Sequence, residues 1–171
     1  AGGLGTRLRS AVPDLPKCMA PVAGKPFLSY VIDHFQAQGI ERFIFSLGYK
    51  HEVIEDFLHT TYGTLQKQYV IEKEPLGTGG AIQLAFRQAT EKNVLVLNGD
   101  TLFKIQVPPL AAFHQQQAAC CTLALKPMQH FDRYGVVELQ ENGAVKSFRE
   151  KQFYESGCIN GGIYALQTDA F

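Results

Sequence analysis

Apolar residues along this chain change their spacing repeatedly, from a helical period to short continuous runs and back. Helical spacing predicts helices over residues 27–38, 51–63 and 81–90. The continuous runs predict buried strands over residues 42–49, 68–72 and 93–97. This alternation is typical of parallel strands joined by helices that cover both faces of a sheet. We therefore predict an α/β fold, a Rossmann-like three-layer αβα arrangement with a mainly parallel central sheet.

The second half of the chain departs from this alternation. Apolar runs predict strands over residues 120–127 and 159–166. Between them, Asn142-Gly143 lies between two further apolar stretches, a pattern that predicts a β-hairpin. We expect these strands to add antiparallel pairs to a single domain over residues 1–171. Because the chain begins inside a loop and stops just after a strand, we expect a fragment that lacks a first strand and a C-terminal part.

Composition argues against several classes of partner. Sixteen basic residues balance sixteen acidic ones, whereas a dedicated nucleic-acid binder usually carries a basic excess. No stretch approaches the roughly 18 consecutive apolar residues that are typical of a transmembrane helix. The four cysteines form no CxxC pair, which argues against a zinc site and fits a reducing cytoplasm. We expect a cytoplasmic protein that binds neither nucleic acid nor a membrane.

Polar or glycine-rich stretches fall at or near the ends of the predicted strands. They are the opening loop and residues 72–80, 98–100 and 159–164. In the last of these, INGGIY, the glycine pair indicates that a ligand or other backbone approaches closely. Ligands of open α/β sheets bind outside the carboxyl ends of the strands, so these stretches are expected to line one cleft.

The opening loop, AGGLGTRL, carries glycines followed by cations. Gly2, Gly3 and Gly5 allow backbone N–H groups to surround an anion closely. Arg7 adds a planar fork that suits phosphate oxygens, and Lys17 adds a mobile point charge. The loop matches neither the GxxxxGK[ST] nor the GxGxxG phosphate motif. It is a phosphate loop of another kind or, in the plainer interpretation, a glycine-rich turn beside surface cations.

Three later stretches carry further candidate ligands. In EPLGTGGA, residues 74–81, glycines and Thr78 precede a predicted helix whose N-terminus can hold an anion or a polar ring. Asp100 follows a buried strand, where a carboxylate is well placed to bind Mg²⁺. Glu150 can accept hydrogen bonds from sugar hydroxyls, and Lys151 can pair with a phosphate. Taken singly, each stretch is also compatible with an ordinary turn, a helix cap or an exposed charge pair.

Together these stretches resemble the sugar-1-phosphate nucleotidyltransferases, also called nucleotide-sugar pyrophosphorylases. The family's GGxGTRL signature and its PK pair match residues 2–8 and Pro16-Lys17, although the proline that usually follows the lysine is Cys18 here. Its EPLGTGGA motif, GD strand end, EK pair and NxGxY strand match residues 74–81, 99–100, 150–151 and 160–164. All five motifs occur in the family's order across nearly the whole chain.

The resemblance implies that a nucleoside monophosphate is transferred from a nucleoside triphosphate to a sugar 1-phosphate, with release of pyrophosphate. It implies catalytic roles for Arg7, Lys17, Asp100 and Lys151, and binding of Mg²⁺ by Asp100. It places the nucleotide at Gly2, Gly3, Gly5, Thr6, Gly77 and Thr78, and the sugar at Gly135, Glu150, Asn160 and Gly161. A second metal-binding aspartate of the family is expected beyond Phe171, and the family allows a homo-oligomer.

Two stretches narrow the resemblance further. Residues 1–28 and INGGIYAL look most like those of guanylyltransferases that act on D-glycero-α-D-manno-heptose 1-phosphate. Enzymes that join GTP to mannose 1-phosphate, or dTTP or UTP to glucose 1-phosphate, share most of the motifs and stay as alternatives. A non-catalytic module that binds nucleotide sugars is an alternative of another class, and the joint presence of the four candidate catalytic residues speaks against it.

Overall fold

The computed structural model of the chain describes residues 15–170. Five of the predicted site residues lie outside that range: Gly2, Gly3, Gly5, Thr6 and Arg7. The elements in chain order are η1 (Lys17–Met19), β1 (Pro21–Val22), β2 (Lys25–Pro26), α1 (Phe27–Gln36), β3 (Arg42–Leu47), α2 (His51–Thr61), β4 (Gln66–Ile71), α3 (Gly77–Phe86), β5 (Asn93–Leu97), α4 (Val107–Gln116), β6 (Cys121–Phe131), β7 (Val137–Leu139), β8 (Val145–Phe148), β9 (Tyr154–Gln167) and η2 (Thr168–Ala170). Helices alternate with strands along the first half, and the predicted α/β class is confirmed.

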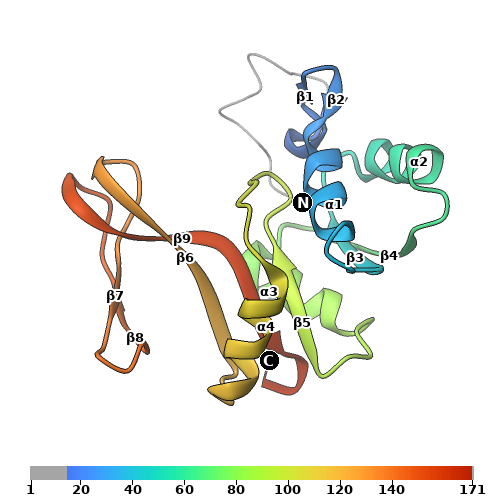
Figure 1. Cartoon of the computed structure of the whole chain (residues 1–171). Coiled ribbons are helices and arrows are strands. Elements are labelled where there is room, and N and C mark those ends of the chain that lie inside the picture. The colour runs from blue at the N-terminus through green and yellow to red at the C-terminus, as the bar shows by residue number, and fades with distance from the viewer. Residues whose placement is uncertain (1–14, 171) are drawn as a thin grey trace.

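The parallel part of the fold consists of β3 and β4, which pair from Arg42 opposite Gln66 to Leu47 opposite Ile71. Helix α2 makes the crossover that two parallel strands require. Every second residue of β3 is buried, and α1 buries residues at helical spacing. Buried side chains of both elements belong to one core cluster, so the apolar faces that the sequence predicted do pack together. Figure 1 shows α1 beside β3 and β4.

The antiparallel part has the strand order β5-β9-β6. Strand β9 begins at Tyr154, earlier than the predicted start at residue 159. The ladder between β6 and β9 is irregular, because Leu123 pairs with Tyr164 whereas Leu125 pairs with Asn160. Three residues of β9 therefore oppose Ala124 alone, which makes a bulge in β9. Figure 1 shows β9 curving where it leaves β5.

Beyond this bulge, β6 and β9 continue as a two-stranded ribbon away from the helices, and the β7–β8 hairpin lies at its far end (Figure 1). We call residues 126–158 the arm. The predicted hairpin is confirmed, with Val137 opposite Phe148 and Gly143 at a positive φ of 81° in the turn. The arm and the rest of the chain are joined through the base of this ribbon, next to Asn160.

Two helices differ from the sequence prediction. Helix α4 was not predicted, because Pro108 and Pro109 interrupt its apolar pattern; they lie in its first turn, where proline is tolerated. Helix α3 begins at Gly77 rather than at residue 81, so the glycines expected before the helix form its first turn. None of the helices within residues 15–170 combines the length and apolar character needed to cross a membrane.

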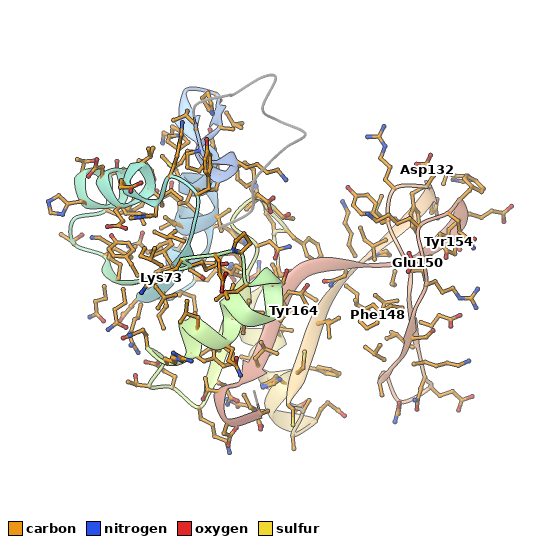
Figure 2. All side chains as sticks on the ribbon, turned by 180° about the vertical axis from the view of Figure 1, so that it is seen from behind. Lys73, Asp132, Phe148, Glu150, Tyr154 and Tyr164 are labelled. Carbon is orange, nitrogen blue, oxygen red and sulfur yellow. The ribbon has the colours of Figure 1, made fainter. Side chains whose placement is uncertain are left out.

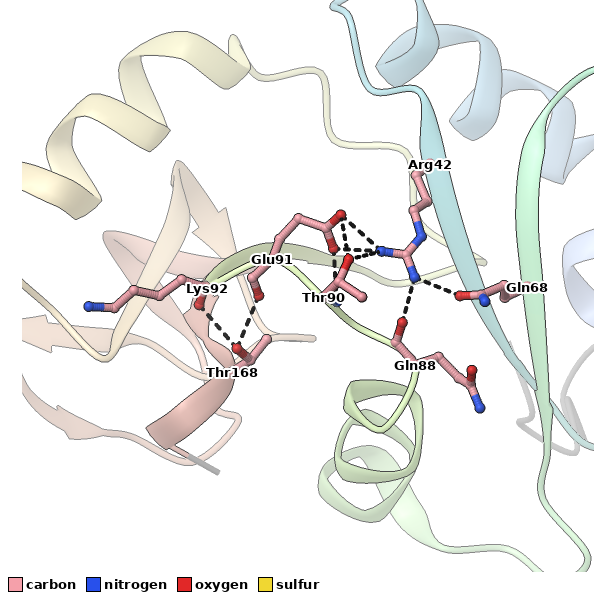
Figure 3. A network of polar contacts seen from close by, with 7 residues as sticks. All are labelled: Arg42, Gln68, Gln88, Thr90, Glu91, Lys92 and Thr168. Carbon is pink, nitrogen blue, oxygen red and sulfur yellow. Dashed lines mark hydrogen bonds and ion pairs between the residues drawn. The ribbon is translucent and has the colours of Figure 1, made fainter.

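Arg42, at the start of β3, ties the parallel strands to the segment between α3 and β5 (Figure 3). Its guanidinium donates hydrogen bonds to Thr90 Oγ1, to the Glu91 carboxylate, to Gln68 Oε1 and to the Gln88 carbonyl, over 2.5–2.9 Å. The Thr168 hydroxyl continues the network, because it lies 3.0 Å from the Glu91 carbonyl and 3.3 Å from that of Lys92. One planar cation thus joins four separate partners across the base of the strands.

Replacing Arg42 with alanine should lower the free energy of unfolding by about 2 kcal/mol, because several hydrogen bonds are lost and their mostly exposed partners turn to water. Arg42→Lys should lose about half as much, since an ammonium group lacks the planar fork. Urea unfolding followed by circular dichroism measures both. An Arg42→Ala protein as stable as the wild type would show that the network adds nothing.

Candidate active site

Lys17 is held in place by its neighbours in the chain. Pro16, Cys18 and Met19 are buried, whereas the Lys17 side chain is 40% exposed. The Met19 N–H donates to the Pro16 carbonyl at 2.8 Å, which closes the short turn of η1. Burial raises the pKa of the Cys18 thiol to about 11, so the thiol is neutral at physiological pH and packs as a small apolar group. The buried neighbours fix the backbone and leave the ammonium group in solvent.

Lys17 and Asp100 meet although they are 83 positions apart in the sequence. Lys17 Nζ lies 2.5 Å from Asp100 Oδ2, and the Asp100 side chain is 38% exposed. Asp100 sits in the loop after β5, and this loop is anchored by Leu102 and Phe103, which pack against the core. An exposed ion pair of this kind contributes only about 0–1 kcal/mol, so a ligand can readily replace it. The structure thus brings two of the predicted catalytic residues together.

The loop that carries Asp100 also lies against β9. The Asn98 N–H donates to the Gly162 carbonyl at 3.1 Å. A Cβ atom on Gly161 would overlap the Phe103 ring, and one on Gly162 would lie 2.5 Å from Asn98 Nδ2. The close approach that the glycine pair indicated is therefore made by side chains of the protein itself. Asn160 and Gly161, the predicted sugar ligands on β9, consequently lie beside the Asp100 loop; their contact with a sugar stays a prediction.

The start of α3 is positioned by Glu72, the residue directly after β4. Its N–H donates to the Leu47 carbonyl at 2.7 Å, and its carboxylate accepts from Ser46 Oγ at 3.1 Å and from the Leu76 N–H at 3.3 Å. Gly77 then begins the helix with a φ of 69°, a conformation that favours glycine. Gly77 and Thr78, the predicted nucleotide ligands, therefore follow the carboxyl ends of β3 and β4.

The remaining predicted residues lie on the arm. Figure 2 shows Glu150 near Asp132 and Tyr154, well separated from Tyr164 in the body of the molecule. The Tyr154 hydroxyl donates to the Glu150 carbonyl at 2.9 Å, and Lys151 follows in the same turn. Gly135 packs against the Arg149 carbonyl, where a Cβ atom would not fit. The structure thus groups Gly135, Glu150 and Lys151 with one another on the arm, apart from Tyr164 in the body of the molecule (Figure 2).

Two residues that the sequence did not single out help to build the site. Glu72 and Asn98 are the first residues after β4 and β5, and each bonds to a neighbouring element. The sequence signal was present, because a polar residue directly after a buried strand lies at the sheet edge where ligands bind. Both residues fall within stretches that the sequence analysis expected to line the cleft, residues 72–80 and 98–100, although neither was named as a site residue.

The donor set at Asp100 fits magnesium and not a metal that needs a full protein cage. Within residues 15–170, no group of three or more His, Cys, Asp or Glu side chains is arranged to hold a metal ion. Asp100 offers one exposed carboxylate, paired with a lysine that a cation can displace. Mg²⁺ usually keeps several waters and takes one or two carboxylates together with substrate phosphates. A single exposed carboxylate is sufficient for that mode of binding.

A nucleotidyl transferase family model matches residues 1–171. The chain belongs to this family, and its predicted resemblance to sugar-1-phosphate nucleotidyltransferases is confirmed. It is 50% identical over 170 residues to a protein of Aneurinibacillus thermoaerophilus named D-glycero-α-D-manno-heptose 1-phosphate guanylyltransferase, covering 99% of this chain and 74% of that one. A Campylobacter jejuni protein of the same name is 46% identical over 170 residues, covering 99% and 75% of the two chains.

Solved structures agree with this family membership. HddC from Yersinia pseudotuberculosis superposes with a TM-score of 0.90 at 35% identity, covering 99% of this chain and 75% of HddC. A second HddC structure, complexed with GMP-PN, gives a TM-score of 0.89 at 34% identity with the same coverage. The predicted α/β fold and the predicted enzyme class, a nucleotidyltransferase, are both confirmed.

Proposed function

We propose that this protein transfers the guanylyl group of GTP to D-glycero-α-D-manno-heptose 1-phosphate, forming GDP-heptose and pyrophosphate. The main structural support for this type of reaction is the contact between Lys17 Nζ and Asp100 Oδ2 at 2.5 Å, because the two residues come from separate motifs of the family. The choice of guanine and heptose is supported by the relatives of that name and by the GMP-PN complex of HddC. Because the reaction consumes a nucleoside triphosphate, we place it in the cytoplasm.

The reaction needs charge stabilisation more than proton transfer. A phosphate oxygen of the sugar 1-phosphate forms a bond to the α-phosphorus of GTP, and the bond from that phosphorus to the pyrophosphate oxygen breaks. The second pKa of a phosphate monoester is about 6, so the attacking group is already ionised at neutral pH. No side chain has to remove a proton. The protein must instead bring several anions together and balance the charge that develops.

Each candidate residue then has a distinct task. When bound, Mg²⁺ would neutralise and orient phosphate oxygens, and Asp100 would hold it. Lys17, paired with Asp100 in the free protein, would turn to a phosphate oxygen near the reacting centre. Arg7 and the glycine loop would bind the part of GTP that leaves as pyrophosphate. Gly77 and Thr78 would lie along the nucleoside.

The arm would supply the sugar contacts. Glu150 would accept hydrogen bonds from sugar hydroxyls, and Lys151 would pair with the phosphate of the sugar. Gly135, which packs against the Arg149 carbonyl, would face the sugar from the arm, while Asn160 and Gly161 would contact the sugar at the base of the arm. A substrate that reaches both groups must span the body of the molecule and the arm, as a nucleotide joined to a sugar phosphate does.

A pyrophosphate-release panel tests the proposal. GTP, UTP, dTTP, CTP and ATP are each paired with heptose, mannose and glucose 1-phosphates in the presence of Mg²⁺. We expect kcat/KM for GTP with heptose 1-phosphate to exceed every other pair by at least about tenfold, a margin that one set of base contacts can supply. A preference for dTTP or UTP with glucose 1-phosphate would overturn the substrates. Nucleotide binding with no release from any pair would overturn catalysis itself.

A further inference from the structure

The side chain of Asn160 is engaged within β9 on both of its polar atoms. Its Oδ1 accepts the Gly162 N–H at 2.9 Å, and its Nδ2 donates to the Tyr164 hydroxyl at 2.8 Å. A backbone N–H can only donate, so this contact fixes which end of the amide is the oxygen. The amide therefore closes the bulge in β9, and the Tyr164 hydroxyl holds the amide in that orientation.

The hydrogen bonds continue from the bulge to the loop of Asp100. The Gly162 carbonyl accepts the Asn98 N–H at 3.1 Å, and the Asn98 carbonyl accepts the Thr101 N–H at 3.4 Å. The Thr101 hydroxyl lies 3.4 Å from Asp100 Oδ1, whereas Lys17 contacts the second carboxylate oxygen, Oδ2. An unbroken series of contacts thus leads from the Tyr164 hydroxyl to the Asp100 carboxylate.

Packing supports the same connection. Gly162 has a φ of 75°, and a Cβ atom there would lie 2.5 Å from Asn98 Nδ2 and 3.1 Å from Asn98 Cγ. The Asn98 side chain therefore rests on the bare α-carbon of Gly162. Any larger residue at position 162 has to move Asn98, and with it the start of the loop that ends in Asp100.

We propose that Tyr164, Asn160 and Asn98 are positioning residues that set the place of the Asp100 carboxylate; we call this series the β9 relay. The inference rests on the proposed function, which assigns to Asp100 the role of holding Mg²⁺. Tyr164 and Asn98 act through Asp100 and not on the reacting atoms. Asn160 keeps one N–H and one lone pair beyond the relay, so it can serve a sugar and the relay together.

The relay is tested by measuring Mn²⁺ binding to the purified full chain by electron paramagnetic resonance, with GTP absent and then present. Tyr164→Phe removes the hydroxyl that orients Asn160 and leaves every predicted ligand in place. Tyr30→Phe is the matched control, because the Tyr30 hydroxyl also makes one 2.8 Å hydrogen bond, to the Val22 carbonyl. Thermal unfolding of both variants shows whether a stability loss alone explains the result.

We expect Tyr164→Phe to weaken Mn²⁺ binding about fivefold, the equivalent of one lost hydrogen bond, and to raise the Mg²⁺ concentration for half-maximal pyrophosphate release by the same factor. Gly162→Ala should weaken Mn²⁺ binding more than about tenfold, because it displaces Asn98 directly. Tyr30→Phe should change the melting temperature by a similar amount. It should leave the affinity for Mn²⁺ and the half-maximal Mg²⁺ concentration unchanged.

Asp100→Asn separates failure of the relay from failure of the proposed function. If wild-type Mn²⁺ binding depends on Asp100 but is the same in Tyr164→Phe, the relay is wrong and the proposed metal site stands. If Mn²⁺ binding is indifferent to Asp100→Asn, the proposed metal site is wrong and the relay falls with it. Should Gly162→Ala not fold, the comparison of Tyr164→Phe with Tyr30→Phe decides alone.

Discussion

Replacing Asp100 with asparagine is expected to lower the rate of nucleotidyl transfer by about a thousandfold, the largest effect of any single change within residues 15–170. Asparagine keeps the size of the side chain but loses the charge that would hold Mg²⁺ among the substrate phosphates. Lys17 loses its partner, yet the exposed pair adds only about 0–1 kcal/mol, so the fold should persist. Pyrophosphate release at saturating substrates and Mg²⁺ measures the loss, and thermal unfolding checks the fold.

Asp169→Asn is the matched control for this experiment. Asp169 is an exposed carboxylate in η2, which follows the last residue of β9, and its loss should leave turnover unchanged. An Asp100→Asn protein that kept more than a tenth of wild-type turnover would rule out Asp100 as the residue that holds the metal. An equal loss in both variants would point to a general effect of removing carboxylates.

Lys17→Ala is expected to lower turnover by about a hundredfold or more, because a cation near the reacting phosphates stabilises the charge that develops there. The fold should be kept, since the buried Pro16, Cys18 and Met19 and not the exposed ammonium group anchor this turn. Lys17→Arg should recover part of the activity, because it keeps the charge but changes its geometry. Pyrophosphate release measures all three proteins.

Lys92→Ala controls for the loss of one exposed lysine. Lys92 lies in the segment tied by the Arg42 network (Figure 3), directly before β5, whereas Asp100 lies in the loop after that strand. The double change of Lys17 and Asp100 should cost less than the product of the single losses, as residues that act as one unit do. Full additivity would mean that the two side chains act independently, in conflict with their direct contact.

The sequence predicted the elements whose apolar residues follow one clear period. Helix α1 and strand β3 were predicted correctly because each buries one regular face. Helix α4 was not predicted; Pro108 and Pro109 break its apolar spacing, although the first turn of a helix accepts proline. The full length of β9 was also missed, since Tyr154 to Cys158 form a strand only through pairing with β6, which local sequence does not reveal.

The sequence identified the motifs of the candidate site but not how their residues are arranged in space. That Lys17 and Asp100 would come together followed from the expectation that the opening loop and the stretch after β5 line one cleft. What fills the space at Gly161 and Gly162 could not be read from the sequence, because Phe103 and Asn98 come from a distant loop. The separation of Glu150 from Tyr164 could not be read from the sequence either, because it depends on where the ribbon of β6 and β9 leads (Figure 2).

The arm has a consequence for how such enzymes can diverge. The chain enters and leaves the arm at one pair of facing residues, Leu125 and Asn160. The whole arm can therefore be exchanged between relatives by joining the chain at those two positions. Such a graft would carry Glu150 and Lys151 into a new background while the junction itself stays untouched. If Glu150 and Lys151 contact the sugar as proposed, preference for one sugar over another can change by recombination of a single segment, without new mutations around the nucleotide.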